Sequence, residues 1–338
     1  MTAERYSPRL ARIVTWLGGQ LSFEQTRQVL DRVGGITLPK TSIWRRMQTW
    51  GARMLAEITQ EQARQLLAAR TWSTPGQRPI AKGAMGIGID GAMVHLRDEG
   101  WKEFKIATVF DVTLVERVDE RTGDRGLFGQ ARNCSYVAHL GGPEELGWLA
   151  WGEAQRRGWH AARDTQVIGD AAAWIWNVQA EHFPDSVTLV DWYHATEHLG
   201  EAKQQLYPEG GAQASRWYNA SEKLLYEGHA AQIGRGLDKA AQASADPGRA
   251  ELLQQAAHYF QNHSQRMQYQ DCRNAGWPIG SGMVESGAKQ FKARVTGPGM
   301  RWSRSGAERV LAVRSAVMTG QERYDALWER AYVNSPPI

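Results

Sequence analysis

The 338-residue chain is poor in the residues and segments that define several common protein classes. Its two cysteines, Cys134 and Cys272, lie far apart without a CxxC pair, which argues against a disulfide framework and a zinc-finger pattern. No stretch approaches the roughly 18 apolar residues of a membrane span, and the N-terminal MTAERYSPRL has no apolar signal core. We therefore expect a cytoplasmic protein without a membrane partner.

Tryptophan, in contrast, is abundant. The chain has 15 Trp, and several of them stand beside Arg or Lys. Hydrophobic residues make up 42% and charged residues 22%, which is typical of a folded globular protein. Aromatic residues next to cations suit base stacking and phosphate contact, although any single Trp more often fills a core.

Positive charge is concentrated near the two ends of the chain. Residues 1–70 carry 11 Lys/Arg against 5 Asp/Glu, and residues 281–315 carry 7 against 2, while the total is only +4. The middle of the chain is therefore acidic. Basic ends around an acidic middle suit a protein that grips a polyanion and holds cations near its centre.

The first 70 residues are expected to form short helices. Apolar residues recur at helical spacing from Leu10, and Ser22 with Gln25 fits a capping box that starts a second helix. A third helix is expected after Pro39, with Arg45 and Arg46 on it as DNA-binding candidates. The pattern resembles a helix-turn-helix unit, and a plain three-helix bundle with surface arginines is the alternative.

After a segment rich in Pro and Gly, the pattern changes to strands. Residues 86–94, one or two strands within 104–118, 165–170 and 186–190 are strand-like, with helices between and after the later ones. The expected order β-β-β-α-β-α-β-α indicates an α/β sheet with covering helices. Residues 194–270 show only helical spacing, which predicts an all-helical insertion.

The predicted organisation has six parts. They are a helical, helix-turn-helix-like DNA-binding region at 1–70, a linker at 71–83, the first part of the core at 84–195, the helical insertion at 196–274, the last part of the core at 275–320, and a C-terminal tail at 321–338.

Three acids stand at positions where active sites form. Asp90 interrupts a strand, Asp170 ends one, and Glu285 opens a helix after a glycine turn. Strand ends and helix starts converge at the edge of an α/β sheet. Three carboxylates there can hold two divalent cations that act on a phosphodiester. Taken alone, an Asp at a strand end is more often a turn residue or a helix cap.

A fourth acid, Asp191, ends the next strand in the segment Asp191-Trp192-Tyr193-His194. One interpretation places Asp191 and His194 beside the metal site, with His194 hydrogen-bonded to a phosphate or a carboxylate. The other is a capping Asp followed by a buried His. The residues do not decide between them.

Basic and aromatic residues follow Glu285. Lys289 and Lys292 share its helical face, and Arg294 comes next, so these side chains are candidates to grip DNA phosphates. An ordinary Glu–Lys surface pair is the alternative for Lys289. Arg301 and Trp302 stand before a further helix start and suit phosphate contact and base stacking.

Four segments together resemble a known family. They are GIDG around Asp90, VIGDAAAWIW around Asp170, LVDWYHATEHL, and GSGMVESGAKQFKARVTGPGMRWS. Over about residues 80–320 the chain is similar to the ISKra group of bacterial insertion-sequence transposases, which are DDE enzymes with an RNase H-like catalytic core. The resemblance implies catalytic and metal-binding roles for Asp90, Asp170 and Glu285. It further implies Mg²⁺ (or Mn²⁺) as the metal, a helical insertion before the Glu, and a D-x-x-H motif at Asp191 and His194.

The expected function is accordingly a DNA transposase that cleaves and joins strands at transposon ends. Its expected partners are transposon-end and target DNA and further copies of itself, in a homodimer or larger synaptic complex near the nucleoid. The alternative is a truncated or domesticated DNA-binding protein without catalysis. A carboxylate glycosidase is a third reading, which does not explain the basic ends.

Overall fold

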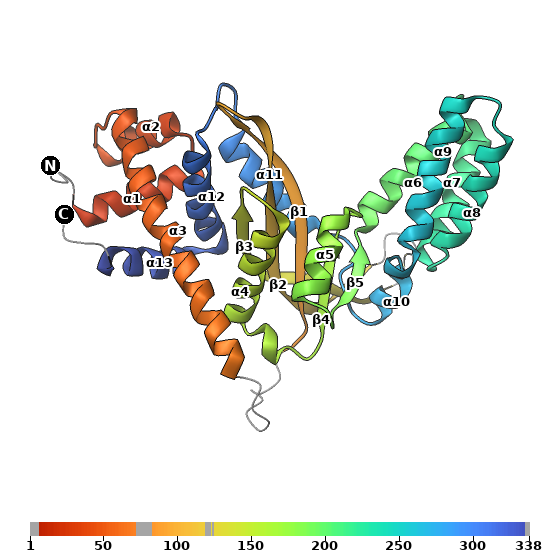
Figure 1. Cartoon of the computed structure of the whole chain (residues 1–338), viewed down its shortest axis with the longest axis horizontal. Helices are drawn as coiled ribbons and strands as arrows, with labels where there is room; N and C mark the ends of the chain where they lie inside the picture. Colours follow the sequence, from red (N-terminus) through yellow and green to blue (C-terminus); the bar gives the residue numbers. More distant parts are fainter. Residues whose placement is uncertain (1–6, 72–82, 119–122, 124, 335–338) are drawn as a thin grey trace.

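The computed structural model describes residues 7–71, 83–118, 123 and 125–334 (Figure 1). Within these ranges a mixed sheet lies between helices in an α/β arrangement. The helices are α1 Pro8–Gln20, α2 Phe23–Gly34, α3 Lys40–Thr71, α4 Pro143–Arg157, α5 Ala173–His182, α6 Trp192–Leu206, α7 Gly211–Tyr226, α8 Ala230–Ala243, α9 Pro247–Asn262, α10 Tyr269–Asn274, α11 Gly282–Val295, α12 Arg304–Thr319 and α13 Gln321–Val333. The predicted linker at 71–83 falls almost wholly outside the described residues.

Five strands form the sheet in the order β3-β2-β1-β4-β5. They are β1 Met85–Leu96, β2 Gly100–Val118, β3 Arg125–His139, β4 Thr165–Gly169 and β5 Val187–Val190. The first three strands pair antiparallel, whereas β4 pairs parallel with both β1 and β5. The predicted α/β class and the order of strands and helices are confirmed. The third strand lies at 125–139, beyond the range in which it was expected.

The two faces of the sheet are covered by different helices because side chains alternate along each strand. Ile87 and Ile89 of β1 belong to a hydrophobic cluster with residues of α4 and α5. Ala92 and Val94, on the opposite face, pack in a second cluster with α11 and α12. Asp90 is two residues before Ala92 on the strand, so both side chains point to the same face of the sheet, which α11 covers.

The N-terminal helices pack against this second face. Ala11 of α1 and Met47, Trp50 and Met54 of α3 lie in one cluster with residues of α11, α12 and α13. The capping box of α2 forms as expected, with reciprocal hydrogen bonds between Ser22 and Gln25. The expected third helix is confirmed and runs much further than the arginines, to Thr71.

The segment interpreted as a C-terminal tail is a helix through Val333. Its buried residues Tyr324, Leu327 and Trp328 join the second cluster, and the Trp328 ring lies 3.9 Å from that of Trp50. This helical stripe was overlooked because charged residues alternate with the apolar ones. The last residues, 335–338, lie outside the described part.

Residues 192–274, which include the segment predicted to be a helical insertion, form the helices α6 to α10. Figure 1 shows α7, α8 and α9 as an arm that projects from the sheet on the side opposite the N-terminal helices. None of the helices in the described ranges combines the length and the hydropathy that a membrane span requires.

The buried position of Trp328 leads to a stability prediction. Trp328→Ala should lower the free energy of unfolding by about 3–5 kcal/mol, because it leaves a cavity against Trp50. Val333→Ala is the control, since Val333 on the same helix is 78% exposed and should change stability by only about 0.5 kcal/mol. Urea unfolding measures both variants, and equal small effects would show that α13 does not contribute to the fold.

Candidate functional site

Three aspartates stand next to one another across the parallel part of the sheet. Ile89 pairs with Gly169 in adjacent strands, and Gly169 pairs with Val190. The residues that follow these three positions are Asp90, Asp170 and Asp191. Parallel strands in register therefore place three carboxylates in a row, at the carboxyl ends of β4 and β5 and beside them on β1.

Asp191 is the most buried of the three, with no solvent exposure. One carboxylate oxygen, Oδ1, accepts a hydrogen bond from the backbone N–H of His194 at 3.0 Å and so caps α6. The other, Oδ2, accepts from the backbone N–H of Ser281, which is 90 residues further along the chain. Asp191 thus joins the start of α6 to the loop that leads into α11.

Glu285 reaches the row of aspartates from α11. This helix can lie close to the sheet because residue 287 is glycine: a Cβ there would stand 2.7 Å from the Tyr136 ring of β3. Glu285 lies in the first turn of α11, four residues after Ser281, whose hydroxyl lies 3.4 Å from Oε1 of Glu285. The loop that Asp191 holds therefore also orients the glutamate.

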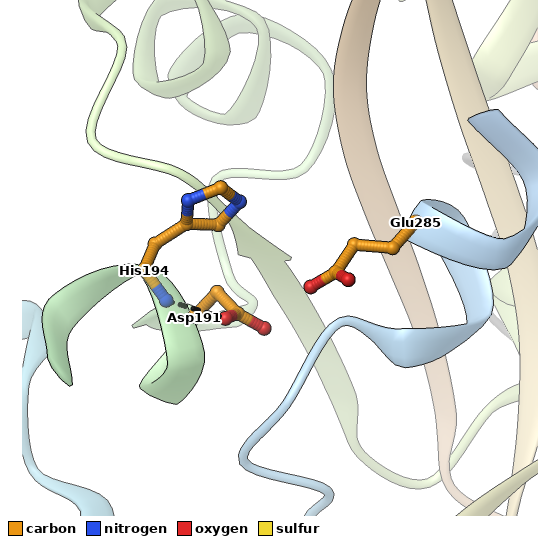
Figure 2. Close-up of side chains that lie close together, drawn as sticks. All are labelled: Asp191, His194 and Glu285. Atoms are coloured by element: carbon orange, nitrogen blue, oxygen red, sulfur yellow. Dashed lines mark hydrogen bonds between the residues drawn. The ribbon is translucent and has the colours of Figure 1, made fainter. Parts of the chain in front are cut away.

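Asp191, His194 and Glu285 converge. Each offers one ligand atom, and these atoms all lie within 4.8 Å of one another. Figure 2 shows the Glu285 side chain extending from α11 toward Asp191, with the His194 ring on the neighbouring helix α6. Two carboxylates and an imidazole at this spacing could hold a divalent cation.

An open cavity of about 300 Å³ lies over this group. Asp90, His194 and Glu285 line it together with Lys289 and Lys292. The Lys289 ammonium lies 3.8 Å from Glu285 Oε2, so the i, i+4 pair that was the alternative for Lys289 is present, and it stands in the wall of the cavity. The site therefore combines acidic and basic groups around a space that a phosphate group can enter.

The electrostatics of Asp90 reflect this crowding. Burial raises the pKa of the Asp90 carboxyl above its ordinary value of 3.8, and the negative charge of Asp170 raises it further. A hydrogen bond from the N–H of Gly91 and the positive charges of His194 and Lys292 lower the pKa and only partly offset the rise. Asp90 is thus a partly desolvated carboxylate beside a second negative charge.

The structure thus brings the predicted triad into one region in an unexpected arrangement. Asp90 and Asp170 are neighbours across β1 and β4, and Asp90 shares the cavity with Glu285. The tight group, however, contains Asp191 and His194 with Glu285. Of the two interpretations of the D-x-x-H segment, Asp191 does cap a helix, but His194 is half-buried and lines the cavity.

Two of the residues predicted to contact DNA, Arg294 and Trp302, are buried in this structure, contrary to the expectation of surface side chains. Arg294 is 2% exposed and donates its Nε–H to the backbone oxygen of Gly18 at 2.7 Å, and its guanidinium lies over the Phe23 and Trp302 rings. Trp302 is 7% exposed and donates its indole N–H to the backbone oxygen of Val295. Both side chains hold the N-terminal helices to α11 and are not on the surface.

Lys289 and Lys292 line the carboxylate cavity, whereas the remaining three predicted DNA contacts lie outside it. Arg45 is exposed and Arg46 half-buried on α3, and Arg301 is exposed between α11 and α12. None of these three lines the cavity at Glu285. The sequence analysis did not identify two residues of the site. Ser281 contacts Asp191 and Glu285, and Tyr193, which is 63% exposed, lines the cavity.

No family model matches the chain, and no curated protein matches it significantly.

The raised pKa of Asp90 predicts a pH-dependent effect on stability. A carboxyl whose pKa is raised on folding stabilises the fold when protonated, and this contribution is lost as the pH rises through the folded pKa. Asp90→Asn, in EDTA at neutral pH, should therefore melt at a higher temperature than the unsubstituted chain. The difference in melting temperature between the two proteins should shrink as the pH falls toward 3.8 and below.

Thermal unfolding followed by circular dichroism measures this difference across the pH range. Asp98→Asn is the control, because Asp98 is exposed and does not line the carboxylate cavity. A lower melting temperature for Asp90→Asn at neutral pH would contradict the electrostatic reading.

Proposed function

We propose that the chain is a DNA transposase of the DDE type, which cleaves and transfers DNA strands with divalent metal ions. The observation that carries the proposal is the row of Asp90, Asp170 and Asp191 across parallel strands, with Glu285 brought to the same place by α11. The mixed five-stranded sheet with its helical insertion is compatible with the RNase H-like core that we propose.

The donors fit Mg²⁺ or Mn²⁺. Asp90, Asp170 and Glu285 would hold the ions through carboxylate oxygens, the ligands that hard cations prefer. Asp90 supports this fit, because a desolvated carboxylate beside Asp170 gains stability when a cation lies nearby. When bound, the metal activates the attacking oxygen and offsets charge on the phosphodiester.

The chain's own groups would position the DNA. Lys289 and Lys292, both exposed, stand one and two turns after Glu285 and would contact phosphates beside the cleaved bond. His194 would donate a hydrogen bond from a ring N–H to a phosphate oxygen. Asp191 would act as a positioning residue through the backbone N–H groups that its oxygens accept, and its remaining lone pairs could add a ligand to the metal beside Glu285.

The proposed assembly follows from the reaction. Two transposon ends must meet, so the active form would be a homodimer or a larger synaptic complex on DNA. The exposed Arg45 and Arg301 would add phosphate contacts outside the cavity.

Removing the acids should separate binding from chemistry. Asp90→Ala and Glu285→Gln should each lower Mg²⁺-dependent nicking of DNA that carries the element's ends by roughly 100-fold or more, because each deletes a metal ligand. DNA affinity in a gel-shift assay should change little. EDTA should abolish nicking by the unsubstituted chain.

The matched control is Glu251→Gln, at an exposed position on α9 in the helical arm, and it should nick normally. Full nicking by both acid variants would remove the enzyme assignment. Binding without nicking by the unsubstituted chain would favour a DNA-binding protein derived from a transposase.

The lysines predict a change in salt dependence. Lys292→Gln should weaken binding to all DNA sequences about equally and reduce the slope of log affinity against log salt by about 1, because one phosphate contact is lost. Lys239→Gln, at an exposed position on α8, should leave the slope unchanged. An unaltered slope in Lys292→Gln would show that this lysine does not contact phosphate.

A further inference from the structure

A second, larger cavity lies beside the carboxylate site and has no role in the reaction proposed above. It encloses about 510 Å³ between the β2–β3 hairpin, the start of α6, α10 and the loop that leads into α11. This volume falls within the range of small-molecule pockets. Its location at the loop held by Asp191 places it next to the proposed chemistry.

The lining of this cavity is aromatic and cationic. Four aromatic residues line it, Phe128, Trp192, Tyr193 and Trp277, and two arginines, Arg117 and Arg273, complete it. No acidic residue is among the described residues that line it. Aromatic faces with cations and without acids suit a nucleobase and its phosphate, because every base has a stackable face and every phosphate a negative charge.

Tyr193 connects the two cavities, because it lines both of them. Tyr193 is 63% exposed, and its ring lies against the backbone of Gly280, where a Cβ would stand 2.7 Å from Cε2 of the ring. An exposed ring supported by backbone on one side offers its surface to a ligand. A nucleotide in the second cavity can thus belong to the same strand as the phosphodiester at the carboxylates.

Polar groups in the lining could orient a base. Gln130 is half-buried in the cavity wall, and its side-chain carbonyl oxygen is buried without a hydrogen-bond partner among the described residues. A side-chain amide can pair with the edge of a base, as donor and as acceptor. The Arg273 guanidinium lies 4.2 Å from the centre of the Phe128 ring, so this wall combines charge with a flat aromatic surface.

We infer that this cavity binds an unpaired DNA base that neighbours the phosphodiester held at the carboxylate site. Tyr193 stacks on the base, Arg117 contacts its phosphate, and Gln130 contacts its edge. The inference rests on the proposed function for the identity of the strand, but base binding itself can be measured without cleavage. A base outside the duplex would hold the strand in place while the neighbouring bond is cut.

The test compares DNA with and without bases, in EDTA so that no cleavage occurs. The full chain is titrated, by fluorescence anisotropy, into a labelled 20-nucleotide oligothymidine and into a strand of equal length with abasic sites at its centre. The oligothymidine should bind roughly five-fold or more tightly, which is the effect of one aromatic–base stack. Tyr193→Ala should remove this preference, and Tyr193→Phe should keep it.

Two controls separate stacking from charge and from folding. Trp101→Ala, at an aromatic residue that is 58% exposed on β2 and lines neither cavity, should retain the preference. Arg117→Gln should weaken binding of both strands equally, because it removes a phosphate contact. Equal affinity of the unsubstituted chain for both strands, or an unchanged preference in Tyr193→Ala, would overturn the inference.

The outcome is independent of the nicking assay. If acid substitutions leave nicking intact while Tyr193→Ala loses the base preference, the catalytic proposal fails and the base-binding cavity stands. If nicking depends on the acids but DNA with and without bases binds equally, the proposed base-binding role of the second cavity fails and the catalytic proposal stands.

Discussion

The geometry of the site depends on the hydrogen bonds that the buried carboxylate of Asp191 accepts. Burying a carboxylate is costly unless hydrogen bonds offset the lost hydration. Asp191 meets that requirement by accepting hydrogen bonds from two backbone N–H groups. One belongs to His194, three residues away, and the other to Ser281, 90 residues away. Because it bonds both, the start of α6 and the loop before α11 keep one relative position. His194 and Glu285 stand on those two elements, so one buried group sets the spacing across the site.

Most residues of the candidate site could be predicted from the sequence, because short local patterns mark their positions. A strand that ends in Asp is visible in the sequence at Asp170 and Asp191, and a glycine turn before a helix marks Glu285. What the sequence did not reveal is which acids group most tightly, because that depends on strand register and on how far α11 slides over the sheet. For Asp191 and His194 the sequence left two interpretations open, a place beside the metal site or a capping Asp with a buried His. In the structure their ligand atoms and that of Glu285 lie within 4.8 Å of one another.

Predictions from short motifs failed where tertiary packing decides exposure. Arg294 and Trp302 look like surface contacts in a basic, aromatic segment, but their side chains meet Gly18 and Phe23 of the N-terminal helices. A contact between residues 276 positions apart leaves no local trace. Burial also lowers the pKa of Arg294 to about 9, an effect that the nearby Arg314 reinforces. The N-terminal helices and the α11 region are therefore one packed body and not separate modules.

The helical arm leaves and rejoins the sheet at a single point. The backbone N–H of Trp192, the first residue of α6, which leads into the arm, donates to the oxygen of Ile279 in the returning loop at 3.0 Å. A segment whose two ends are bonded together adds little closure entropy when its length changes. The arm can consequently gain or lose helices over generations while the strands below keep their alignment. Extra helices at this junction would lengthen the protein without moving Asp170 or Asp191 relative to each other.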